Sequence, residues 1–366
     1  MRFDRSSIVQ SDYKSIMSTV LNVGIVGTGI FARDRHLPSY QEMPSEFKVV
    51  AAFNRTKSKA LDFAKVAGVS EDKVYDDLDG ILNDKDVSYV DALLPAQFNL
   101  ATAQKAIAAG KPILMEKPIA ATMEQARGLV KLSDSTDLPI GIAENWLYLS
   151  VIDIAKKHLA RIGPIVGFTH NSTGPFVTQN KYLATTWRKT PEHIGGFLSD
   201  GGVHQLALVT DLVGNFDTVS AQTKQVRKES GTDDIVFSTV KIVDSDVIGT
   251  FTYGSAFGAT DKSVYLKIYG LNGSVLIQLS DKKKPYVRVQ VGGSAETAGK
   301  EEIYPVEAED SFGVNEEFKS FHEAVSNKDK SLYKGSPRVA FHHLACVAAF
   351  LESSSKSGDN VKVERI

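Results

Sequence analysis

The sequence predicts an α/β N-terminal domain with a parallel, doubly wound sheet, followed by an α+β C-terminal domain with a largely antiparallel, open sheet. From residue 21 to about residue 143, apolar strands alternate with segments of helical periodicity, which is typical of a parallel sheet flanked by helices. After Trp146, strand-like segments follow one another with few helices between them. The length of 366 residues also exceeds the roughly 250–300 residues that one hydrophobic core serves, so two domains are expected.

Hydrophobic periodicity places the individual elements. In the first half we expect an opening strand from Leu21, strands at Phe47–Phe53, Tyr89–Leu94, Ile113–Glu116 and Ile140–Ala143, and helices at Lys57–Ala67, Asn99–Ala109 and Met123–Ser133. In the second half we expect helices at Val151–Arg161, Asp200–Val213, Asn315–Ser326 and Pro337–Ser353, and strands at Val166–Ser172, Thr218–Val226, Ile235–Val243, Val247–Tyr253, Val264–Tyr269, Ser274–Leu279 and Tyr286–Val291. We therefore assign residues 1–17 to an unstructured extension, 18–145 to the first domain and 146–366 to the second, whose last helix could pack back on the first.

Composition excludes several classes of function. The 42 Lys and Arg residues nearly balance 44 Asp and Glu residues, so the net charge of −2 gives no reason to expect a nucleic-acid partner. No apolar run reaches the roughly 18 residues that a membrane span needs, and we expect no membrane association. The single cysteine, Cys346, excludes an internal disulfide, and its apolar neighbours indicate a buried, inert thiol. We expect no metal site and a cytosolic protein with access to the nucleus by diffusion.

The first sixteen residues are polar and lack the apolar core of a secretion signal. One hypothesis is that translation naturally starts at Met17. The alternative is a weak organelle-targeting arm containing Arg2 and Arg5, against which Asp4 and Asp12 count.

A glycine motif follows the first strand and indicates a dinucleotide-binding, or Rossmann, fold. Gly27 permits the tight turn, Gly29 lets the backbone approach a pyrophosphate, and Ala32 keeps the next helix close to the sheet. The N-terminus of that helix favours phosphate through its free N–H groups and partial positive charge. We expect the loop residues Gly27, Thr28, Gly29, Ile30 and Phe31 to bind the cofactor.

The end of the second strand predicts NADP(H) over NAD(H). NAD-binding folds usually place a carboxylate here to accept from the ribose 2′-hydroxyl, whereas this chain has Asn54-Arg55-Thr56, with Lys59 in the next helix. Arg55 can pair with a 2′-phosphate and stack on adenine, and Thr56 can donate a hydrogen bond. The alternative is that Arg55 is only a solvated residue at a helix start.

Two separate segments carry candidate catalytic groups. Glu116-Lys117-Pro118 follows the fifth strand, whose carboxyl end faces the ligand crevice, so Lys117 could stabilise an alkoxide or relay a proton; a surface loop explains the tripeptide almost as well. Asp200 and His204 are four residues apart within a glycine-rich segment, and on a helix they share one face. Asp200 could then orient His204 as a general base, while the glycines let the backbone approach a ligand. The alternative is a helix-capping Asp200 beside an unrelated surface histidine.

These residues together resemble the glucose–fructose oxidoreductase/inositol dehydrogenase/rhizopine-catabolism (Gfo/Idh/MocA) family of NAD(P)-dependent oxidoreductases. The matching motifs are Gly27-Thr28-Gly29-Ile30-Phe31-Ala32, Glu116-Lys117-Pro118, Gly195-Gly196-x-Leu198-x-Asp200-x-Gly202-x-His204 and the closing segment from Glu352 to Val363. Within the family, the chain looks most similar to an uncharacterised group of fungal NADP(H) oxidoreductases. The resemblance implies Lys117, Asp200 and His204 as the catalytic set, and a homodimer formed through the second sheet.

The chain departs from the family pattern at two positions. Asn99 replaces the usual histidine after the fourth strand, and Ala207 stands where many members have an aspartate. These changes are compatible with hydride transfer. They weaken any inference of a specific substrate from other members of the family. We still count Leu94, Pro95, Asn99 and Glu116 among the cofactor contacts.

Three further residues are candidates for binding a small-molecule substrate. Trp187 and Arg188 suit a sugar or polyol ring, although Trp187 could equally pack at the domain interface. Asn145, at the domain junction, could reach the nicotinamide or the substrate. We expect NADP(H)-dependent hydride transfer at a CH–OH or C=O carbon. The alternatives are a non-catalytic NADP(H)-binding regulator and a dihydrodiol dehydrogenase.

Overall fold

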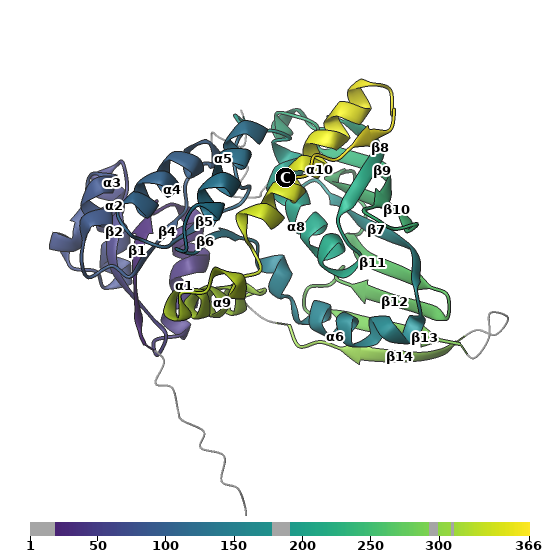
Figure 1. The fold of residues 1–366 in the computed structure, drawn as a ribbon, viewed down its shortest axis with the longest axis horizontal. Helices are drawn as coiled ribbons and strands as arrows, with labels where there is room; N and C mark the ends of the chain where they lie inside the picture. The colour runs from purple at the N-terminus through teal and green to yellow at the C-terminus, as the bar shows by residue number, and fades with distance from the viewer. Residues whose placement is uncertain (1–18, 178–190, 293–298, 309–310) are drawn as a thin grey trace, which may run out of the picture.

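The computed structural model describes residues 19–177, 191–292, 299–308 and 311–366, and it contains two sheets side by side (Figure 1). The first sheet has six parallel strands in the order β3-β2-β1-β4-β5-β6. This confirms the predicted doubly wound sheet. The strands are β1 (Leu21–Val26), β2 (Phe47–Phe53), β3 (Val74–Tyr75), β4 (Tyr89–Ala92), β5 (Ile113–Glu116) and β6 (Ile140–Ala143).

The strand order reverses between β1 and β4, which both pair with their neighbours in parallel. Such a switch point opens a crevice at the carboxyl ends of the strands, and ligands of open α/β sheets bind there. Helices connect the strands: η1 (Ala32–His36), α1 (Leu37–Glu42), α2 (Lys57–Ala67), α3 (Leu78–Asn83), α4 (Asn99–Ala108) and α5 (Met123–Asp134). The turn η1 is a π-helix, which the sequence pattern did not indicate.

The second sheet has nine strands in the order β14-β13-β12-β11-β7-β10-β9-β8-β15. Its pairings are antiparallel except for β10 with β7, which run parallel. Strand β14 was not predicted, because its alternating Lys300–Pro305 segment carries few apolar residues. The strands are β7 (Ile165–Pro175), β8 (Phe216–Lys224), β9 (Ile235–Ile242), β10 (Ile248–Phe257), β11 (Ser263–Gly270), β12 (Gly273–Gln278), β13 (Tyr286–Val291), β14 and β15 (Val361–Lys362).

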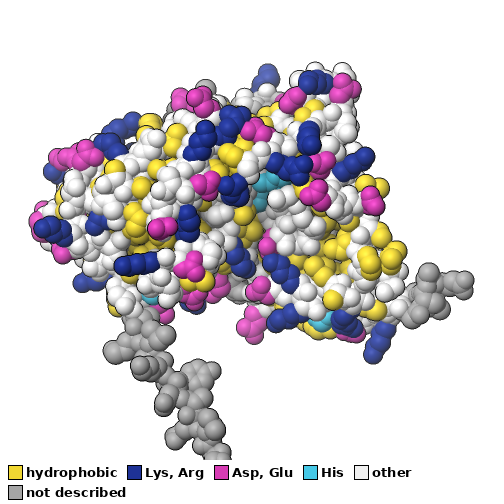
Figure 2. Space-filling view, viewed as in Figure 1, with side chains coloured by type: hydrophobic (Ala, Val, Ile, Leu, Met, Phe, Trp, Pro, Cys, Tyr) yellow, Lys and Arg dark blue, Asp and Glu magenta, His cyan; other side chains and the backbone are white. Residues whose placement is uncertain are grey.

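One face of the second sheet is covered by helices α6 (Ser150–Leu159), α8 (Phe197–Leu212) and α10 (Pro337–Ser355) (Figure 1). Helix α8 contacts both α6 and α10. Aromatic rings fill the space between helix and sheet: Phe251 of β10 stacks on Phe350 of α10, with ring centroids 5.4 Å apart. Helix α10 also packs against α5, and α9 (Val314–Asn327) packs against α1, so the end of the chain returns to the first sheet. Acidic and basic side chains are interspersed over the face shown in Figure 2.

Candidate active site

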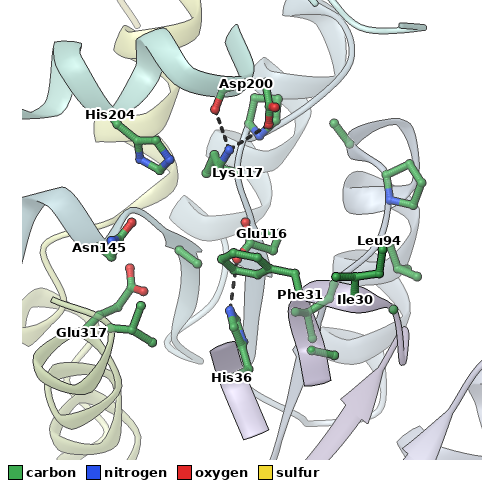
Figure 3. A pocket seen from close by; sticks show the side chains of 18 of the residues that line it. Ile30, Phe31, His36, Leu94, Glu116, Lys117, Asn145, Asp200, His204 and Glu317 are labelled. Atoms are coloured by element: carbon green, nitrogen blue, oxygen red, sulfur yellow. Dashed lines mark hydrogen bonds and ion pairs between the residues drawn. The ribbon is translucent and has the colours of Figure 1, made fainter. Parts of the chain in front are cut away.

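A pocket of about 390 Å³ lies at the carboxyl ends of the parallel strands, between the first sheet and helices α8 and α9 (Figure 3). Its lining includes residues of the glycine loop, Lys59 of α2, and the candidate catalytic residues Lys117, Asp200 and His204. The volume falls within the roughly 300–1,000 Å³ of small-molecule sites. Of the predicted cofactor residues, the lining includes Gly29, Ile30, Phe31, Lys59, Leu94, Pro95, Glu116 and Lys117.

The glycine loop has the backbone geometry that a phosphate cradle requires. Gly27 has a φ of +98°, and a Cβ there would lie 2.5 Å from the carbonyl oxygen of Leu93. A Cβ on Gly29 would meet no atom within 4 Å, so this side of the loop faces open space. The loop therefore leaves the open space beside Gly29 that the approach of a pyrophosphate to the backbone would need.

The end of β2 is hydrogen-bonded to the glycine loop. Asn54 donates to the hydroxyl of Thr28 at 3.0 Å and accepts from the backbone N–H of Thr56 at 2.9 Å. Thr28 is buried, so it supports the loop from within rather than lining the pocket.

Four cationic side chains lie around the N-terminus of α2, and one of them, Lys57, is ion-paired with Asp76 at 3.2 Å. Arg55 and Lys59 are exposed, and an Nη atom of Arg33 lies 3.5 Å from the Lys59 carbonyl oxygen. The first turn of α2 carries no acidic residue. This rim combines a helix N-terminus with side chains that attract a phosphate.

Lys117 and Asp200 meet across the pocket, although they are 83 residues apart in the sequence (Figure 3). The ammonium of Lys117 donates to the Asp200 carboxylate at 2.9 Å and to the Asp200 backbone carbonyl at 2.5 Å. The Lys117 side chain is 12% exposed. Because an ammonium has three N–H donors, one remains for a ligand oxygen.

The carboxylate that holds the His204 ring is Glu144, which corrects the expectation that Asp200 orients it. His204 Nδ1 lies 2.6 Å from Glu144 Oε1, and the ring stacks on Trp146. Glu144 is 2% exposed and also accepts from the Trp146 backbone N–H at 3.3 Å. A carboxylate on Nδ1 favours the tautomer with its proton there, so Nε2 presents a lone pair.

Asn99 supports the loop that carries Lys117 instead of lining the pocket. Its amide group faces the carbonyl oxygens of Glu116, Pro118 and Ile119 at 3.1–3.2 Å. Asn99 is fully buried. Asn99 thus fixes the position of the loop between β5 and α5.

His36 connects Glu116 to the interior of the first domain. Its Nδ1 lies 2.6 Å from Asp91 and its Nε2 lies 3.1 Å from Glu116. Burial alone would lower the pKa of His36, but the carboxylates of Asp91 and Glu116 outweigh burial and raise it to about 10. His36 is therefore an imidazolium at neutral pH, and it holds the Glu116 side chain at the pocket wall.

The glycines before His204 make room for protein atoms, which corrects the expectation that they admit a ligand. A Cβ on Gly201 would lie 2.0 Å from the Tyr253 hydroxyl, and one on Gly195 would lie 2.4 Å from Val347. Asn145 does line the pocket, held by a hydrogen bond to the Phe312 carbonyl at 2.7 Å. The proposed substrate residues Trp187 and Arg188, and residues 1–17, lie outside the described residues.

The sequence reasoning missed Glu144, His36 and Glu317, although all three line or contact the pocket. Glu144 follows β6 just as Glu116 ends β5, so the strand-end criterion that selected Lys117 could have found it. His36 and Glu317 lie within helical segments, where no sequence signal separates them from surface residues.

Models of one oxidoreductase family match both halves of the chain. The model described as "Oxidoreductase family, NAD-binding Rossmann fold" matches residues 21–143, and the one described as "Oxidoreductase family, C-terminal alpha/beta domain" matches residues 156–363. An uncharacterised protein of Saccharomyces cerevisiae, YMR315W, is 69% identical over 94% of this chain and 99% of its own length.

Solved structures show the same architecture. An oxidoreductase from Thermotoga maritima has a TM-score of 0.81 and 30% identity, over 94% of this chain and 99% of its own. A levoglucosan dehydrogenase in complex with NADH also has a TM-score of 0.81, at 20% identity, over 95% of this chain and all of its own. Within the described residues, no helix is both long enough and apolar enough to cross a bilayer.

Proposed function

Because this chain belongs to the Gfo/Idh/MocA family of NAD(P)-dependent oxidoreductases, we propose that it transfers hydride between NADP(H) and a CH–OH or C=O carbon of a sugar, polyol or similar small molecule. The observation that carries the proposal is that Lys117 and His204 line the same pocket as the glycine loop. An acid–base group and a cation thus lie in the same pocket as the loop expected to bind the cofactor, as hydride transfer requires.

His204 acts as the acid–base group. Its Nε2 has no protein partner among the described residues and can take the substrate's hydroxyl proton in oxidation and return it in reduction. Glu144 holds the ring and stabilises the imidazolium that forms. When bound, NADP(H) supplies the hydride acceptor or donor.

Lys117 stabilises the negative charge that develops on the substrate oxygen. Its third N–H is available for that oxygen, while Asp200 fixes the ammonium through two hydrogen bonds. In this mechanism Asp200 is a positioning residue for Lys117.

The rim around α2 supports NADP(H) as the cofactor. Arg33, Arg55 and Lys59 supply positive charge, and the first turn of α2 has no carboxylate to repel a 2′-phosphate. Asn54 and Thr56, joined by a hydrogen bond, shape the same turn.

The test is a screen of sugars, polyols, dicarbonyls and dihydrodiols for a change in NADPH absorbance. With a substrate in hand, Lys117→Ala and His204→Ala should each lose about 10²–10⁴-fold in turnover and still bind NADPH. Lys131→Ala, an exposed lysine on α5, is the control. Near-full activity in either pocket variant would remove that residue from the mechanism, and NADPH binding without turnover of any compound would favour the regulator.

A further inference from the structure

Glu317 is a buried carboxyl group in the pocket wall that the proposed mechanism does not use. Helix α9 brings it to the pocket, whose wall also includes Glu116 at the end of β5 (Figure 3). The residue is 1% exposed. A charge at such a position is costly unless it is paired, so its protonation state needs an explanation.

The hydrogen bonds around Tyr333 indicate that Glu317 carries a proton. The Tyr333 hydroxyl oxygen lies 3.0 Å from Glu317 Oε1 and 3.1 Å from the Ile142 carbonyl oxygen. A carbonyl can only accept, and a tyrosine has one proton to donate. Both contacts are hydrogen bonds only if Tyr333 donates to Ile142 and a neutral Glu317 donates to Tyr333.

The surrounding charges agree with a neutral acid. Burial raises the pKa of Glu317 well above its ordinary value, and the carboxylates of Glu116 and Glu144 raise it further. His36 and a hydrogen bond with Tyr333 lower the pKa of Glu317, but these effects are smaller than that of burial, and the two ring nitrogens of His36 already face Asp91 and Glu116. The titratable groups facing Glu317 from the elements around it are Glu116, Glu144, His36, Tyr148 and Tyr333.

We propose that Glu317 is a proton-bearing residue that makes this site distinguish oxidised from reduced nicotinamide. The inference rests on the proposed function, because hydride transfer to or from a substrate held by Lys117 and His204 requires the nicotinamide ring in the pocket that Glu317 also lines. The oxidised ring is a cation and the reduced ring is neutral. A cation near Glu116, Glu144 and Glu317 favours ionisation, so binding of the oxidised cofactor converts the Glu317 carboxylic acid to a carboxylate and releases one proton to solvent.

Tyr333 suits both states of Glu317. Facing the neutral acid, its hydroxyl donates to Ile142; facing the carboxylate, the same proton can turn to Glu317. When the proton turns, Tyr333 loses its hydrogen bond to the Ile142 carbonyl and donates one to the Glu317 carboxylate. The site therefore needs no other rearrangement to accept the ionised form.

Calorimetric titration of the full chain with NADP⁺ and with NADPH tests this inference. Titrations between pH 6.5 and 9, in two buffers with different ionisation enthalpies, give the number of protons released on binding. We expect up to one proton released with NADP⁺ and none with NADPH, and a Kd for NADP⁺ that falls by up to tenfold per pH unit. Both nucleotides carry the same phosphates, so their difference removes the phosphate contribution.

Glu317→Gln should abolish the proton release and the pH slope and change the Kd of NADPH by less than about twofold. Glu323→Gln, an exposed position on the same helix, should behave as the unmutated protein. Tyr333→Phe, which keeps the acid but removes the hydroxyl that serves the carboxylate, should move the pH slope to higher pH. Binding of NADP⁺ without proton release, or release that survives Glu317→Gln, would overturn the inference; failure of either nucleotide to bind would instead overturn the proposed function.

Discussion

Replacing Glu144 tests which carboxylate controls His204. Glu144→Gln leaves an oxygen that can accept from His204 Nδ1 and from the Trp146 N–H, and it removes only the charge. Hydrogen bonds to charged groups are worth about 1.5–3 kcal/mol and neutral ones about 0.5–1.5 kcal/mol. The difference of about 1–1.5 kcal/mol predicts a roughly tenfold loss in kcat.

Glu144→Ala removes the acceptor as well as the charge. The ring then loses its fixed tautomer, and we expect a loss of about 10²-fold or more in kcat, within the range of positioned acid–base catalysis. Asp200→Asn is the matched comparison, because its amide oxygen and unchanged backbone carbonyl can still accept from Lys117. It should affect the stabilisation of the substrate oxygen and leave the His204 tautomer unchanged.

Two measurements separate these outcomes. Initial rates of NADPH absorbance change give kcat as a function of pH. The part of this pH–rate profile that depends on the protonation of His204 should change in the Glu144 variants and stay the same in Asp200→Asn. Nitrogen-15 NMR of the histidine rings reports the His204 tautomer directly, without substrate. If Asp200→Asn changes the His204 ring signals and Glu144→Ala does not, the assignment of Glu144 as the orienting carboxylate is wrong.

Two further predictions concern cofactor choice and stability. Arg55→Asp should weaken NADPH binding by tenfold or more, because charge-assisted hydrogen bonds of about 1.5–3 kcal/mol are lost, and it should change NADH binding by less than about twofold. Fluorescence titration measures both affinities. A preference of the unmutated protein for NADH would contradict the reasoning. His36→Gln should lower the free energy of unfolding by about 3–5 kcal/mol, because it leaves the buried Asp91 without its charged partner, as urea denaturation would show. The pKa of His36 is about 10 in the folded protein and about 6.5 in the unfolded chain, so the advantage of the unmutated protein is full below pH 6.5 and disappears as pH rises through 10. His158→Gln, at a partly exposed position, should show no such pH dependence.

Local patterns were sufficient where the chain's own periodicity sets the structure. The bounds predicted for β2, β5, β6 and α2 are those observed, because buried parallel strands are short apolar runs and α2 has a clear apolar stripe. The helix expected at Asp200 begins earlier, at Phe197, where Gly195 and Gly196 adopt positive φ values. The sequence pattern did not predict strand β14, because this strand lies at the edge of the sheet and needs few apolar residues.

The sequence by itself determined the fold class, the glycine cradle and the strand-end position of Lys117, because these depend on residues close together in the chain. Only the tertiary structure decided which carboxylate pairs with His204 and which with Lys117. Glu144 reaches His204 across 60 residues and Asp200 reaches Lys117 across 83, and helical spacing alone had paired Asp200 with His204. Such pairings depend on how the helices of the second domain pack over the first sheet, and so does the burial that leaves Glu317 in the pocket wall.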